Sequence, residues 1–187
     1  MVRFKQFLIL TVFIWFLSPI LTLQAEVTQI DKYKKAIESD PKDFVAYLEL
    51  GRAYQKLGLY ENAIAEYREA LNLEPIYSAA YQGIGGSYGE MRQYDKAAKA
   101  YQKAVDLDPN YPEAQYGLGW SFYHLDRFED AIDPLLIAIN FKPSLGTAHF
   151  ALGQTYAALG DFEKAINRFK ETLRLIPTYP EAYLELG

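Results

Sequence analysis

The chain has 187 residues, half of them apolar, with 16 Tyr, 11 Phe, no Cys and a formal net charge of −5 at pH 7. That apolar content is enough for one domain with a sizeable core, and the lack of cysteine excludes disulfides, thiolate nucleophiles and cysteine-based metal sites. The acidic balance argues against a nucleic-acid partner, because phosphate binding needs a basic face.

Residues 1–25 have the composition of a signal segment. Arg3 and Lys5 supply the positive start, an apolar run with one threonine covers residues 7–17, and Ala25 is the small residue that a signal peptidase accepts before its cut. The apolar character continues beyond residue 17 to about the length of a membrane span, so an uncleaved signal anchor remains an alternative. With either reading we expect the remainder of the chain outside the cytoplasm, exported to the periplasm or secreted, or held at the membrane.

A fixed period runs through the rest of the chain. Prolines recur every 34 positions, at Pro41, Pro75, Pro109, Pro143 and Pro177, and aligning them places Gly51, Gly85, Gly119, Gly153 and Gly187 in one column. A fixed period of this length indicates a repeat architecture. We therefore expect a repeat domain over residues 26–187, divided into a half-repeat 26–43, full repeats 44–77, 78–111, 112–145 and 146–179, and a partial repeat 180–187.

Each full repeat predicts two short helices. In the first repeat Tyr47, Leu50 and Tyr54 share one face of a helix, and Gly58 follows as a stop. A second helix then runs to the region of Pro75, where a helix cannot continue. A single helix pair cannot bury both of its faces, so neighbouring pairs must stack.

The columns of the alignment resemble the tetratricopeptide repeat family. Its pattern of an aromatic or bulky residue, Leu-Gly, Tyr, Ala, an aromatic residue, Ala and Pro is matched in the first repeat by Tyr47, Leu50, Gly51, Tyr54, Ala63, Tyr67, Ala70 and Pro75. The second repeat matches it with Tyr81, Ile84, Gly85, Tyr88, Ala97, Tyr101, Ala104 and Pro109. The resemblance implies an all-α fold, a right-handed solenoid of antiparallel helix pairs, with a concave groove that binds a protein or peptide partner.

One glycine-rich stretch, residues 83–89, invites comparison with a phosphate-binding loop. That motif would require glycine at position 88, which is Tyr88, and the register of the repeat places the stretch inside a helix rather than after a strand. We interpret Gly85 as the packing glycine of its repeat. Gly86 and Gly89 fall on the groove side, where we expect them to leave a hollow beside Trp120 that admits a ligand group.

The groove stripe of the first helices is predicted from its position relative to the glycine column. Its candidate partner-binding residues are Arg52, Gln82, Gly86, Gly89, Tyr116, Trp120, Tyr123, Phe150, Gln154 and Leu184. We expect the three aromatic residues of the third repeat to form an apolar wall with Phe150 and Leu184, and to act as a binding hot spot. The alternative is that these rings only fill space between neighbouring first helices.

The third repeat departs from its pattern in two places. Pro134 lies inside the second helix, where it should remove the hydrogen bond to the carbonyl of Asp130 and kink the helix at a cost of ~3 kcal/mol. Asp126 occupies the column in which Gly58 and Gly160 stand. Such departures mark candidates for function, or drift in a tolerant repeat.

Nothing in the sequence predicts catalysis. The two histidines, His124 and His149, have no carboxylate at a fixed spacing that would suggest a base or a metal site, and no hydrolase or zinc-protease motif occurs. We expect no catalytic residue, no metal and no cofactor, and interpret the protein as a non-catalytic interaction scaffold. Self-association through the last partial repeat, or a role as the adaptor portion of a longer chain, remain alternatives.

Overall fold

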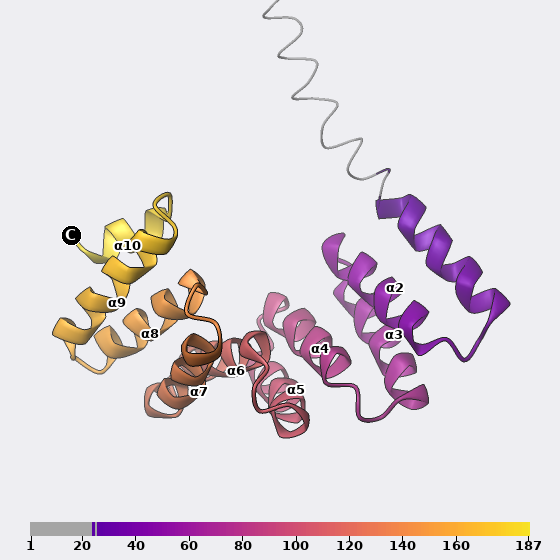
Figure 1. Cartoon of the computed structure of the whole chain (residues 1–187), viewed down its shortest axis with the longest axis horizontal. Coiled ribbons are helices and arrows are strands. Elements are labelled where there is room, and N and C mark those ends of the chain that lie inside the picture. The colour runs from indigo at the N-terminus through magenta and orange to yellow at the C-terminus, as the bar shows by residue number, and fades with distance from the viewer. Residues whose placement is uncertain (1–23, 25) are drawn as a thin grey trace, which may run out of the picture. The chain divides into compact units, whose positions relative to one another are not determined.

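The computed structural model describes Gln24 and residues 26–187, and this part of the chain is helical with short turns and no strand (Figure 1). The predicted signal segment therefore lies, except for Gln24, outside the described residues. None of the described helices combines the length and the apolar composition that crossing a bilayer requires. The prediction of an all-α fold is confirmed.

The helices follow one another in the predicted order. Helical residues 26–39 precede α2 (Phe44–Lys56), α3 (Tyr60–Leu73), α4 (Ser78–Glu90), α5 (Tyr94–Leu107), α6 (Pro112–His124), α7 (Phe128–Phe141), α8 (Gly146–Ala158), α9 (Phe162–Leu175) and α10 (Pro180–Glu185). The chain divides into two compact units, of which the first ends at Leu73 and the second comprises residues 74–187. The first unit contains the pair α2 and α3, and the second contains the pairs α4 with α5, α6 with α7 and α8 with α9, followed by α10.

Glycine lets the two helices of each pair approach closely. A Cβ atom at the column glycine would lie between 2.6 and 2.8 Å from the side chain 16 positions later, in the pairs Gly51 and Tyr67, Gly85 and Tyr101, Gly119 and Leu135, and Gly153 and Phe169. Real Cβ atoms do not come that close, so only glycine fits without rearrangement. The interpretation of Gly85 as a packing glycine is confirmed.

The turn inside each pair uses a left-handed backbone residue. The φ angles are +73° at Gly58, +57° at Arg92, +57° at Asp126 and +79° at Gly160, so the same column carries this conformation in all four full repeats. Asp126 thus takes the glycine conformation without being glycine, which costs a non-glycine residue roughly 1–2 kcal/mol.

The helix α7 continues through Pro134 to Phe141, so the proline does not end it. Pro134 is itself buried, together with Ala131 and Leu135, on the face that packs inward. Burial of the ring offsets part of the cost of the missing N–H donor.

Candidate partner-binding surface

The first helices of the second unit form a continuous inner row (Figure 1). Helix α4 packs on α6, and α6 packs on α8, in addition to the contact that each makes with its own pair. Within residues 74–187, the second helices α5, α7 and α9 show no comparable contact with one another. The row of first helices is therefore the inside of the stack, and we call the exposed side of α4, α6, α8 and α10 the inner face.

An aromatic cluster occupies the inner face on α6. Tyr116, Trp120 and Tyr123 stack nearly parallel, with ring centroids 6.4 Å and 5.4 Å apart and interplanar angles of 19° and 12°. His124 adds an edge contact, with its ring centroid 4.3 Å from that of Trp120, and its other side stacks on Tyr94 at 4.3 Å. The cluster follows from the spacing of three and four residues along α6, which places these side chains on one helical face.

The cluster packs against the protein core and remains partly exposed to solvent. All four of its rings are half-buried, and Tyr116, Trp120 and Tyr123 pack against the core of the last two helix pairs. The rings thus fill space between helices and remain partly exposed, and their role as a binding hot spot stays a prediction. A ring that is fixed on one side and exposed on the other loses little conformational entropy when it binds.

Burial raises the pKa of two of these tyrosines. The pKa of Tyr116 rises to about 12, mainly because the phenol is desolvated and also because Tyr179 and the carboxylate of Glu90 lie nearby, although its side-chain hydrogen bond with Thr147 acts in the opposite direction. Desolvation likewise raises the pKa of Tyr123, with smaller contributions from Glu185 and Asp126. Both phenols are therefore protonated at neutral pH and available as hydrogen-bond donors.

Phe150 does not belong to this surface, so its predicted place in the exposed wall is wrong. Its side chain is only 6 % exposed, and its ring lies 5.6 Å from Phe169 and 4.9 Å from Tyr179. Tyr179, in the turn before α10, covers Phe150 from the side of the following repeat. The stacked aromatic rings of the inner face thus lie on α6, and Phe150 is not one of them.

The remaining predicted residues are spread over both units. Arg52 lies in the first unit, where it is exposed and pairs with Glu49 on its own helix. Leu184 on α10 is 81 % exposed. Gln82, Gly86 and Gly89 are half-buried on α4, and a Cβ atom at Gly89 would meet nothing within 4 Å.

Gln154 on α8 connects the inner face to α10. Its amide nitrogen Nε2 donates to Oε1 of Glu185 at 3.2 Å, whereas its own Oε1 is buried without a hydrogen-bond partner. An unsatisfied buried acceptor of this kind costs ~1–3 kcal/mol until a donor reaches it. Glu90, Glu185 and His124 were absent from the predicted site, although each lies on an inner-row helix, because a residue's neighbours across helices are not visible in a single repeat.

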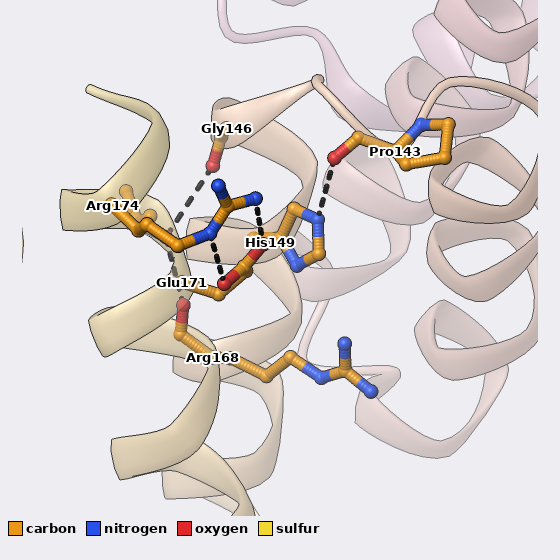
Figure 2. A network of polar contacts seen from close by, with 7 residues as sticks. Pro143, Gly146, His149, Arg168, Glu171 and Arg174 are labelled. Atoms are coloured by element: carbon orange, nitrogen blue, oxygen red, sulfur yellow. Dashed lines mark hydrogen bonds and ion pairs between the residues drawn. The ribbon is translucent and has the colours of Figure 1, made fainter.

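A second polar site surrounds His149 on α8 (Figure 2). Nε2 of His149 lies 3.1 Å from the carbonyl oxygen of Pro143, and its Nδ1 is buried without a partner. The pKa of His149 is lowered, mainly by burial and further by Arg168 and Arg174, despite the opposing effects of the Pro143 carbonyl and Glu171. The neutral ring therefore donates through Nε2 to the carbonyl.

The His149 contact is repeated elsewhere in the second unit. Gln115 donates to the carbonyl of Pro109 at 2.8 Å, and Tyr183 donates to the carbonyl of Pro177 at 3.1 Å, so the contact occurs at the same position of three successive repeats. Three different side chains donate to the equivalent proline carbonyl, so the contact has a structural role in the repeat. No three His, Cys, Asp or Glu side chains of the described residues are grouped so that they could hold a metal ion.

Comparison with known proteins agrees with this architecture. Models of the tetratricopeptide repeat match residues 32–65, 84–144 and 154–187. No curated protein matches the chain.

Several solved structures are similar. A crystal structure of MamA is 28 % identical with a TM-score of 0.70, covering 78 % of this chain and 85 % of that one. YrrB, described as a TPR protein with an unusual peptide-binding site, is 25 % identical with a TM-score of 0.71, covering 82 % and 79 %. The protein pilF of Pseudomonas aeruginosa is 25 % identical with a TM-score of 0.70, covering 78 % and 68 %. With the period, the helix pairs and their packing glycines, these matches show that the chain belongs to the tetratricopeptide repeat family, whose members mediate protein–protein interactions.

Proposed function

We propose that the protein is a non-catalytic scaffold that binds an extended or helical segment of a partner protein on the inner face of its second unit. The observation that carries the proposal is the aromatic cluster of Tyr116, Trp120 and Tyr123, whose rings are fixed against the core and open on the other side. Large, preorganised aromatic side chains of this kind dominate the energetics of protein interfaces. The similarity to a peptide-binding repeat protein supports the same role.

The test identifies the partner and then measures its affinity. A photo-crosslinking amino acid in place of Tyr123 in the full chain captures the bound segment, which mass spectrometry then locates within the partner. Binding of the purified partner segment is followed by the fluorescence of Trp120, the only tryptophan in residues 26–187.

Replacing Trp120 by alanine should weaken that binding about 30-fold, the effect of losing a hot spot worth ~2 kcal/mol. Binding to this variant is measured by calorimetry, since the fluorescent group is gone. The matched control is Phe162→Ala on α9, a ring that is 66 % exposed and lies outside the inner row. Unchanged affinity of the Trp120 variant, with its helical content intact, would contradict the proposed site.

We also propose that the repeats work outside the cytoplasm, in an exported or membrane-anchored protein. The support is the composition of residues 1–25. Alkaline phosphatase fused after Gly187 is active only when exported, so the fusion should be active with the complete chain and inactive without residues 1–25. Equal activity of the two fusions would contradict export.

Self-association is the second candidate function, because α10 presents large apolar side chains to solvent. Tyr183 is 56 % exposed and Leu184 is 81 % exposed. If this surface joins two copies, the mass in solution falls to that of a monomer when both residues are replaced by serine. A monomer before and after the replacement excludes this function.

A further inference from the structure

The charges of the second unit are segregated between its inner and outer helices. The inner-row helices α4, α6, α8 and α10 contain no Lys or Arg and carry the carboxylates of Glu90, Glu113, Glu181 and Glu185. The helical Lys and Arg residues of this unit lie on α5 and α9, at Lys96, Lys99, Lys103, Lys164, Arg168, Lys170 and Arg174. The inner row is therefore acidic, and the outer helices are mixed.

Most of the inner carboxylates are not neutralised by the protein itself. Glu113 pairs with Lys142 at 2.7 Å. Among the described residues, no Lys or Arg forms an ion pair with Glu90, Glu181 or Glu185. Glu185 accepts only the neutral amide of Gln154. Their negative charge thus remains available to a bound segment.

Two of these carboxylates end helices next to the one that carries the aromatic cluster: Glu90 ends α4, which packs on α6, and Glu185 ends α10 and accepts from Gln154 on α8, which also packs on α6. Glu90 is close enough to Tyr116, and Glu185 to Tyr123, for each to raise the pKa of its neighbour. Aromatic rings flanked by carboxylates offer a cationic side chain a cation–π contact and a counter-charge.

The positive groups nearest to the cluster do not reverse this balance. Burial lowers the pKa of His124 the most, Arg92 lowers it further, and Asp126 acts on the same ring in the opposite direction. Arg127 is held over the ring of Phe122 at 4.3 Å and paired with Asp130. An acidic segment on the inner face would meet uncompensated repulsion, which argues against it.

We infer that the segment bound on the inner face is basic, with Arg or Lys side chains that contact the α6 aromatic cluster and the carboxylates of Glu90 and Glu185. This inference rests on the function proposed above and adds the chemistry of the partner. Apolar side chains between the basic ones contact the exposed parts of the Tyr116 and Trp120 rings, as expected of a segment that alternates the two kinds of residue.

The test uses three synthetic peptides with the purified full chain, in which Trp15→Phe leaves Trp120 as the fluorescent reporter. One peptide repeats Arg-Leu-Ala, and the others carry Gln or Glu in place of Arg. The Arg peptide should bind at least about tenfold more tightly than the Gln peptide, the Glu peptide should bind more weakly still, and the preference should shrink with added salt. Equal affinity for all three peptides, or no binding of the Arg peptide, overturns the inference.

Charge-removing variants locate the preference on the inner face. Glu90→Gln and Glu185→Gln should each weaken the Arg peptide about threefold, as expected for partly exposed charges, and leave the Gln peptide unaffected. The control Glu163→Gln lies on the outer helix α9 and should leave all affinities unchanged. An equal effect of the control, or no effect of either inner variant, overturns the assignment.

The two proposals can fail separately. If the segment captured by the Tyr123 crosslink is neutral or acidic and its binding still depends on Trp120, the basic chemistry is wrong and the binding site stands. If Trp120→Ala leaves both the captured segment and the Arg peptide bound with unchanged affinity, the site itself is wrong.

Discussion

Replacing Gly117 by alanine should destabilise the protein, although alanine is the better helix former. Gly117 lies in the middle of α6, where a Cβ atom would come within 2.2 Å of Cζ of Tyr101 on α5. The Tyr101 ring cannot move away easily, because its other contacts include Gly85, whose own Cβ position lies only 2.8 Å from the ring. The ring is buried at 8 % exposure and fills a notch between two glycines from two successive helix pairs.

The magnitude follows from two opposing effects. Forcing a methyl group into a filled core costs about 3 kcal/mol at the upper end of the usual range, which suits so severe an overlap. Exchanging glycine for alanine inside a helix stabilises the helix by about 1 kcal/mol. The net loss in the free energy of unfolding is thus about 2 kcal/mol, measured from the shift in the urea midpoint followed by circular dichroism.

Gly89→Ala is the matched control, since it places the same methyl group in the neighbouring first helix, where nothing lies within 4 Å. This variant should be more stable than the wild type by roughly 0.4–1 kcal/mol. In a Tyr101→Leu background, the cost of Gly117→Ala should shrink because the smaller side chain vacates the notch. Stabilisation by Gly117→Ala equal to that by Gly89→Ala would refute the reasoning.

Two further changes probe the core and the repeated carbonyl contact. Phe150→Ala should lower the free energy of unfolding by about 3–5 kcal/mol, as for a buried ring. A thermal melt of this variant with an unchanged melting temperature would contradict the place of Phe150 in the core. His149→Gln should be nearly neutral at pH 8, since Gln115 makes the same contact, whereas His149→Leu leaves the Pro143 carbonyl unpaired and should cost ~1–3 kcal/mol. The pKa of His149 is lower in the folded protein than its ordinary value of 6.5, so its contribution to stability is full above pH 6.5 and is lost as the pH falls toward the folded pKa. Denaturation series from pH 8 to about pH 5 should therefore show the free energy of unfolding of the Gln variant rising relative to that of the wild type.

The helix pairs could be predicted from the sequence because their determinants are local and periodic. The packing glycine, Gly85 in the second repeat, recurs in every full repeat. The turn position of Gly58 has the same left-handed backbone conformation in all four full repeats. Phe150 shows where this reasoning ends. Its position in the repeat is that of Tyr116, but the ring of Tyr179, the last residue of the same repeat, covers it, and the size of a covering residue is not part of the periodic pattern.

The candidate site was predictable only as a stripe of one helix. The spacing of Tyr116, Trp120 and Tyr123 placed them on a common face, which the structure shows as a stacked cluster. The unsatisfied oxygen of Gln154 and the position of Glu185 depend on contacts between α8 and α10. Such contacts form between repeats, and a repeat pattern describes each repeat by itself.

The Tyr101 ring has a consequence for how the second unit opens. Since it is clasped by Gly85 of its own pair and by Gly117 of the following pair, α6 cannot detach without exposing a ring that belongs to the preceding pair. In a linear array of repeats, a side chain shared in this way strengthens the stabilising interaction between neighbouring repeats relative to the intrinsic stability of each repeat. The helix that carries the aromatic cluster should therefore exchange its amide hydrogens in one cooperative event with α4 and α5, and a partner that holds α6 in place would protect all three helices.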